Sequence, residues 1–223
     1  MSTKSLAARF AELQAERERT WSKEQLEKNA AQRRILVERF DPASRPKAGD
    51  KLAPFTLVDA EGGTIESTAL LANGPAVLVF FRFGGCPACN IALPYYNETI
   101  APALADAGIP LLAVSAQIPV DKGPTERHGL TFPTYGDPGY ALGRQLKLTF
   151  LPEDQPAVQP GQPWIGATLG TDSYEITEPA VIIIESDHTI RFIDASPDWL
   201  ARSEADAVLA HLPEVGVETS QAA

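Results

Sequence analysis

Cysteine, basic charge and long apolar runs are all scarce in this sequence of 223 residues. Only two cysteines are present, so a framework of several disulfides cannot hold the fold together. Lysine and arginine number 19 against 29 acidic residues, and the formal charge of -10 has the wrong sign for a surface that binds nucleic acid or anionic lipid. The longest apolar run, Ala76 to Phe81, is far shorter than the roughly 18 residues that cross a bilayer. These features argue against nucleic-acid and membrane partners.

The remaining composition is that of an ordinary globular protein, with 44% apolar and 22% charged residues. At roughly 150 residues per domain, the length suggests one domain with an extension. The first residues contain no apolar core of a secretory signal, so we expect a cytoplasmic protein.

The N-terminal segment lacks both glycine and proline over residues 2–40 and is rich in alanine, glutamate and arginine. Ser22 with Gln25 three residues later resembles a capping box, which predicts a pair of helices rather than one rod. We expect this arm to pack its apolar stripe onto the rest of the protein, with a homodimer formed through the arm as the alternative. Prolines in residues 41–46 mark a boundary. The predicted organisation is a helical arm (1–46), a main domain (47–212) and a flexible tail (213–223).

The main domain alternates apolar runs with helical patterns, which predicts an α/β layered sheet covered by helices. Strands are expected at residues 55–58, 76–81, 109–116, 181–184 and 190–195, and helices from Pro87, at 125–129 and at 203–212. Residues 151–177 contain four prolines and predict a long loop, either a plain surface insertion or part of a site wall.

The two cysteines form a Cys-x-x-Cys motif directly after the predicted central strand. Two glycines lead into Cys86, and Pro87 occupies what would be the first helical position, where its missing N–H costs nothing. The start of a helix stabilises a thiolate, and in such motifs the thiol pKa falls to about 3.5–7.5. Cys86 is therefore the predicted nucleophile, and Cys89, one turn further along, is the predicted resolving thiol.

Two other interpretations of the cysteines fit the sequence less well. A zinc site needs a second pair of ligands, but the three histidines, His128, His188 and His211, are scattered singly. Two inert buried cysteines would leave the Gly-Gly-Cys-Pro arrangement unexplained. Redox chemistry without a bound metal or other cofactor is the best account of the motif.

Several segments, taken in order along the chain, resemble the thioredoxin-like superfamily and, within it, the alkyl hydroperoxide reductase/thiol-specific antioxidant family of peroxiredoxins. They are residues 47–57, residues 77–82 leading into Cys-Pro-Ala-Cys, residues 129–133 with Asp137, residues 178–184 and residues 190–192. The resemblance covers residue 47 to about residue 212. It implies a thioredoxin-like fold with a central mixed sheet flanked by helices, and it implies that Pro179 is a cis-proline facing the reactive sulfur.

The sequence departs from the family pattern at two places. Typical members carry threonine or serine three residues before the peroxide-attacking cysteine and proline four residues before that, whereas counting from Cys86 gives Phe83 and Val79. The family also places an arginine beside the strand-entry proline, where this chain has Glu178. Three other arginines are candidate substitutes: Arg82, Arg144 and Arg202.

By resemblance, the protein is expected to reduce hydrogen peroxide or organic hydroperoxides. Cys86 would attack the O–O bond and become a sulfenic acid, Cys89 would condense with it, and a thioredoxin-like or glutathione-linked donor would reopen the disulfide. Arg82, Pro87 and Pro179 would shape the site. The alternatives left open are a thiol-disulfide oxidoreductase acting on protein disulfides and a non-catalytic protein that binds a partner through its helical arm.

Overall fold

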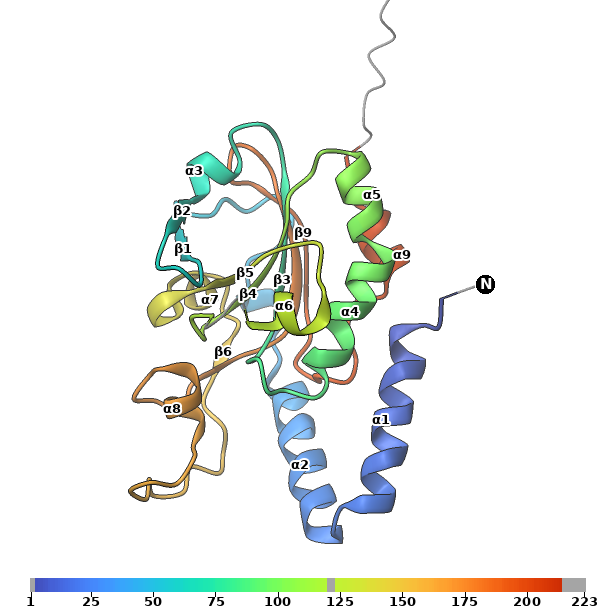
Figure 1. Ribbon diagram of the computed structural model, residues 1–223, viewed down its shortest axis with the longest axis vertical. Helices are drawn as coiled ribbons and strands as arrows, with labels where there is room; N and C mark the ends of the chain where they lie inside the picture. The colour runs from blue at the N-terminus through green and yellow to red at the C-terminus, as the bar shows by residue number, and fades with distance from the viewer. Residues whose placement is uncertain (1–2, 120–122, 214–223) are drawn as a thin grey trace, which may run out of the picture.

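The computed structural model describes residues 3–119 and 123–213, and within them a seven-stranded mixed sheet forms the centre of the protein. Its strand order is β2-β1-β5-β4-β3-β8-β9 (Figure 1). The strands are β1 (Thr56–Val58), β2 (Thr64–Glu66), β3 (Ala76–Phe80), β4 (Leu111–Ser115), β5 (Thr134–Gly136), β8 (Ala180–Ile184) and β9 (Ile190–Ala195). Two further short strands, β6 (Thr149–Phe150) and β7 (Ile176–Thr177), pair separately.

Strand β3 lies between parallel β4 and antiparallel β8, and every one of its residues is buried. This explains the uninterrupted apolar run in the sequence, because a strand covered on both faces needs no polar alternation. The expected strands and the mixed α/β architecture are confirmed. The three-residue strands β2 and β5 were not predicted, because neither lies in an apolar run like the one that marks β1.

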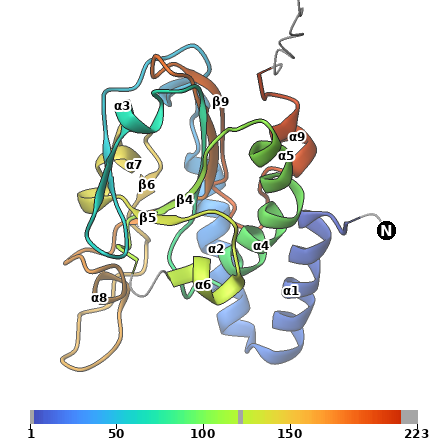
Figure 2. The same cartoon turned by 45° about the horizontal axis from the view of Figure 1, so that its top comes forward.

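Helices cover both faces of the sheet (Figures 1 and 2). The helices are α1 (Leu6–Thr20), α2 (Lys23–Arg39), α3 (Ser67–Leu70), α4 (Cys89–Thr99), α5 (Ala101–Asp106), α6 (Gly123–His128), α7 (Ala141–Gln145), α8 (Ile165–Leu169) and α9 (Ala205–Leu209). Val77 and Val79 of β3 pack in one core with α4, α5 and α9, whereas Leu78 and Phe80 pack in the other with α3 and α7. Successive side chains of β3 point to opposite faces of the sheet, so the strand contributes buried residues to both cores.

The arm is the expected pair of helices, α1 and α2, which Figure 1 shows as a hairpin at one end of the molecule. The capping box is confirmed, because the Gln25 N–H donates to Oγ of Ser22 at 3.2 Å and the Ser22 N–H donates to Oε1 of Gln25 at 2.9 Å. Leu6, Phe10 and Leu36 are buried in the same core as the two cysteines. The arm therefore packs its apolar stripe onto the domain, as predicted.

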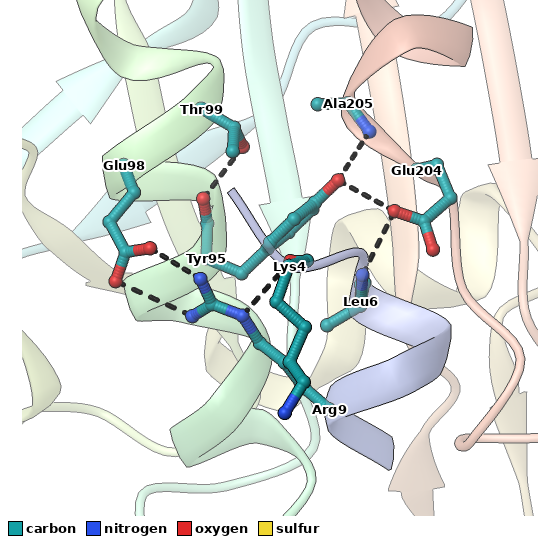
Figure 3. Close-up of polar contacts among 8 residues, drawn as sticks. All are labelled: Lys4, Leu6, Arg9, Tyr95, Glu98, Thr99, Glu204 and Ala205. Atoms are coloured by element: carbon teal, nitrogen blue, oxygen red, sulfur yellow. Dashed lines mark hydrogen bonds and ion pairs between the residues drawn. The ribbon is translucent and has the colours of Figure 1, made fainter. Parts of the chain in front are cut away.

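The beginning of α1 is fixed by the carboxylate of Glu204 (Figure 3). This carboxylate accepts hydrogen bonds from the N–H groups of Leu6 at 3.0 Å and Ala7 at 2.8 Å. It also accepts one at 2.6 Å from the hydroxyl of Tyr95, whose oxygen accepts the N–H of Ala205 at 3.0 Å. Negative charge at a helix N-terminus is stabilising. Although burial opposes it, these hydrogen bonds lower the pKa of Glu204.

Some element boundaries differ from the predictions. Helix α4 begins at Cys89 rather than Pro87, and α9 begins at Ala205 rather than Ser203, whose hydroxyl donates to the carboxylate of Asp194 at 2.6 Å instead of capping the helix. The proline-rich segment 151–177 holds one short helix, α8. Residues 214–223 lie outside the described residues, so the flexible tail and the domain division remain predictions. No helix among the described residues could span a membrane.

Candidate functional site

The loop between β3 and the Cys-x-x-Cys motif is held by side chains from neighbouring elements. Oγ of Ser115, at the end of β4, donates to the carbonyl of Arg82 at 3.1 Å. Oε1 of Gln117 accepts the Gly84 N–H at 2.8 Å, and Nη1 of Arg127 from α6 donates to the carbonyl of Gly84 at 2.6 Å. These contacts give the loop one fixed path from the central strand into the first cysteine.

The two cysteines lie on either side of the point at which the regular helix begins. The N–H of Cys86 donates to the Phe83 carbonyl at 3.1 Å, and its carbonyl accepts the Asn90 N–H at 3.0 Å. Cys86 therefore stands in the turn that leads into the helix, whereas Cys89 belongs to its first turn. Both are free thiols, with only 2% of Cys86 and none of Cys89 exposed.

Hydrogen-bond donors converge on the sulfur of Cys89. Sγ accepts the main-chain N–H of Arg82 at 3.4 Å and Nη2 of Arg202 at 3.4 Å. The thiol of Cys86 donates to it as well. Burial opposes a charge there, but these donors and the Arg202 charge together bring the pKa of Cys89 well below that of an ordinary thiol.

The pKa of Cys86 moves in the other direction. The hydrogen bond that it donates to Cys89 and its own burial raise its pKa well above the ordinary value. The low pKa predicted for Cys86 is therefore wrong for this arrangement, and the lower pKa of the pair belongs to Cys89. The motif places both thiols near the helix start, but the sequence spacing does not reveal on which sulfur the donors from distant segments converge.

Arg202, in the segment that follows β9, supplies the one side-chain cation in contact with a cysteine sulfur among the described residues. Its Nε donates to the carbonyl of Trp199 at 2.9 Å, and its guanidinium lies 5.5 Å from the centre of the Phe10 ring. The arm and the domain together therefore fix its position. Of the other two candidate arginines, Arg82 contacts the sulfur through its main chain, and Arg144 pairs with Glu175 at 3.0 Å on the surface.

The expectation of a cis-proline at position 179 is wrong, because the described part of the chain holds no cis peptide bond. The Glu178 N–H donates to the Leu148 carbonyl at 2.6 Å, and the Pro179 carbonyl accepts the Ser196 N–H at 2.7 Å. The chain thus runs extended from β7 into β8, with the trans bond that most prolines adopt. Pro179 borders a small internal void together with Arg202 and lies close to the site.

Glu178, which stands where the family places an arginine, is engaged elsewhere. Its carboxylate is buried and accepts a hydrogen bond from Nη1 of Arg45 at 2.5 Å. Burial raises the pKa of Glu178, and the Arg45 charge opposes that rise. Pro87, the remaining predicted site residue, is exposed in the turn between the two cysteines.

A buried dithiol at the end of the central strand of such a sheet defines a thiol redox protein with a thioredoxin-like fold. The chain belongs to the AhpC/TSA family, whose family model matches residues 48–193. No curated protein matches the chain. Because the family match begins at residue 48, both helices of the arm lie outside it.

Solved structures with the same fold include several peroxiredoxins. Peroxidoxin BcpB from Mycobacterium tuberculosis is 22% identical with a TM-score of 0.55, and the match covers 74% of this chain and 96% of that one. Reduced Prx3 from Vibrio vulnificus, in complex with H₂O₂, is 20% identical with a TM-score of 0.57, covering 74% of this chain and 98% of that one. A putative thioredoxin reductase from Burkholderia cenocepacia is 20% identical with a TM-score of 0.57, and the match covers 76% of this chain and 99% of that one.

Proposed function

We propose that this protein is a thiol-dependent peroxidase that reduces hydrogen peroxide or organic hydroperoxides through the Cys86/Cys89 pair. The observation that carries the proposal is the pair of N–H donors on Sγ of Cys89, from the Arg82 main chain and the Arg202 guanidinium. A thiolate is the species that attacks a peroxide, and these donors stabilise it at neutral pH. Membership of the AhpC/TSA family supports the same activity.

The charge distribution suggests that Cys89 is the attacking sulfur and Cys86 the resolving one. The Cys89 thiolate attacks the terminal oxygen of the hydroperoxide, the O–O bond breaks, and Cys89 becomes a sulfenic acid. The departing alkoxide, or hydroxide in the case of hydrogen peroxide, takes the proton of the Cys86 thiol and leaves as an alcohol or water. The Cys86 thiolate then attacks the Cys89 sulfur, and hydroxide leaves and is protonated to water, so that a disulfide forms.

This assignment also accounts for one departure from the family pattern. Counted from Cys89 instead of Cys86, the position three residues earlier, at which the family carries threonine or serine, is Cys86 itself. Its S–H donates a hydrogen bond to the attacking sulfur, the kind of contact that a hydroxyl would make. The position four residues before that is Arg82, whose main-chain N–H donates to the same sulfur.

We further propose that an external thiol donor, either thioredoxin-like or glutathione-linked, reopens the disulfide through a mixed disulfide. We also propose the cytoplasm as the site of action, since a dithiol that an intracellular thiol donor recycles works in a reducing compartment. The alternative, exchange with protein disulfides, would use the same pair, and the rate of oxidation by peroxide separates the two activities.

Stopped-flow oxidation of the reduced protein by hydrogen peroxide tests the proposal. We expect a rate constant far above that of free cysteine for the natural sequence and for Cys86→Ser, which should stop at a sulfenic acid that a dimedone reagent traps. Cys89→Ser should lose the fast reaction. If the natural sequence reacts no faster than free cysteine, the peroxidase proposal fails, and turnover of disulfide substrates would then support the exchange reaction instead.

A further inference from the structure

A cleft of about 360 Å³ lies between the helical arm and the loop that carries the cysteines. Trp21, Gln25, Lys28 and Gln32 line it from the arm, and Arg82 and Trp199 line it from the domain. Of these lining residues, the family match over residues 48–193 includes only Arg82. No feature of the proposed peroxidase reaction accounts for the cleft.

Three buried nitrogen atoms at or directly behind the cleft have no hydrogen-bond partner among the described residues. They are Nε of Arg82, Nε2 of Gln32 and Nη1 of Arg17. Buried polar atoms in folded proteins are almost always paired, so three unpaired donors in one place call for an explanation. All three are donors and none is an acceptor, which points to an acceptor ligand such as an anion.

The charge in this region is also unbalanced. Arg17 is only 5% exposed, and the charged groups that influence it are Cys86, Arg33 and Arg82. Arg33 is neutralised by Asp198 at 2.6 Å, but within residues 3–119 and 123–213 neither Arg17 nor Arg82 forms an ion pair. Two guanidinium groups with no carboxylate partner among the described residues therefore lie beside the redox pair of a protein whose net charge is -10.

The walls of the cleft are apolar as well as cationic. The Arg82 guanidinium lies 4.3 Å from the centre of the Trp199 ring, and the Arg17 guanidinium lies 4.7 Å from the centre of the Trp21 ring. Because each guanidinium stacks on an indole through its face, the N–H groups along its edge remain available to donate hydrogen bonds. A ligand that combines a carboxylate with a hydrocarbon chain matches both properties, whereas a small inorganic anion would match the charge alone.

Arg82 connects the cleft to the reacting sulfur, because its side chain lines the cleft while its main-chain N–H donates to Sγ of Cys89. We propose that the cleft binds the carboxylate of an organic hydroperoxide, so that the preferred substrates are hydroperoxides of carboxylic acids with an apolar chain. This inference rests on the proposed peroxidase function and names its substrate class. The chemistry is unchanged, with the hydroperoxide reduced to the hydroxy acid and the dithiol oxidised.

The kinetic test compares linoleic acid hydroperoxide with its methyl ester as oxidants of the reduced full-length protein. We expect the rate constant for the acid to be roughly tenfold higher than that for the ester, about the ratio that one charge-assisted hydrogen bond would produce. This ratio should be smaller at high salt. Gln32→Leu and Lys28→Gln should each lower the acid-to-ester ratio of rate constants. Lys23→Gln is the matched control on α2, since Lys23 is exposed, does not line the cleft and pairs with Glu27 at 3.8 Å.

A binding measurement separates this proposal from the proposed function. Decanoate cannot oxidise a thiol, and we expect it to quench the tryptophan fluorescence of the reduced protein, whereas methyl decanoate should not. Rapid oxidation by hydrogen peroxide with an acid-to-ester ratio near one and no decanoate binding would overturn the substrate class alone. Decanoate binding together with slow oxidation by every peroxide would overturn the peroxidase function and leave a carboxylate site.

Discussion

Arg202 reaches Cys89 across 113 residues of sequence, and its Nη2 donates to the cysteine sulfur at 3.4 Å. Arg202 follows the last strand, β9, whereas Cys89 begins the helix after the central strand β3. The contact therefore depends on the completed sheet and on Phe10 of the arm, over which the guanidinium lies. It places a buried positive charge at one sulfur of the pair and not at the other.

The first prediction concerns which sulfur ionises. In Cys86→Ser, Cys89 should keep a pKa below that of an ordinary thiol, because Arg202 and the Arg82 N–H still donate to it. In Cys89→Ser, the burial of Cys86 should keep its pKa above the ordinary value. Ultraviolet absorbance of the thiolate against pH measures both values. A lower pKa for Cys86 than for Cys89 would restore the roles expected from the sequence.

The second prediction concerns Arg202 itself. Arg202→Met keeps much of the packing against Phe10 but removes the charge and the donor, so the Cys89 pKa should rise and peroxide oxidation should slow by about a hundredfold. Arg144→Met is the matched control, because Arg144 pairs with Glu175 on the surface. Stopped-flow rates measured from neutral to alkaline pH check the mechanism. If thiolate stabilisation is the cause, part of the lost rate returns as the pH rises.

The order of the longer elements could be predicted from the sequence because each of them carries its own local signal. The apolar run of β3 indicates a strand buried on both faces, and Ser22 with Gln25 forms the predicted capping box at the start of α2. The placement of Cys86 and Cys89 at the beginning of a helix also follows from local pattern, since glycines and a proline punctuate the chain there. These predictions require only neighbours in sequence.

The electrostatics of the site depend on contacts between distant segments, and local pattern carries no information about them. Nothing in the sequence distinguishes Arg202 from Arg144 as the partner of the sulfur. The expected cis bond before Pro179 came from the family resemblance and not from the residues themselves, and the structure has the trans bond there. The proximity of Arg17 to the redox pair results from the tertiary packing of the arm. The periodicity of the arm predicts that its apolar stripe packs onto the domain, but it does not predict which residues meet.

The third prediction concerns the attachment of the arm. Because the native pKa of Glu204 lies below its ordinary value of 4.5, its contribution to stability is complete above that value and is lost as the pH falls through the lower native pKa. Glu204→Gln should therefore speed hydrogen exchange of the α1 amides at neutral pH, and the natural sequence should match it only in acid. Glu98→Gln, which breaks the exposed ion pair with Arg9, should change exchange little. Equal effects of the two variants would contradict a specific role for Glu204.

The fourth prediction concerns the buried ion pair of Arg45 and Glu178. Arg45→Met leaves the Glu178 carboxylate buried without its partner and should lower the free energy of unfolding by about 3 kcal/mol at neutral pH. Burial already raises the pKa of Glu178, and removing the opposing Arg45 charge raises it further. A group with a raised acid pKa destabilises the fold most when it is ionised, so the loss should shrink as the pH falls and Glu178 takes up a proton.

Urea unfolding of the natural sequence and of Arg45→Met at neutral and mildly acidic pH checks this. Arg39→Met serves as the control, because the ion pair of Arg39 with Glu153 is exposed and should contribute less than about 1 kcal/mol at either pH. Glu178→Gln combined with Arg45→Met should recover part of the stability at neutral pH, since it removes the charge that burial penalises. A loss in Arg45→Met that is the same at both pH values would show that packing of the arginine side chain, and not the unpaired carboxylate, accounts for the destabilisation.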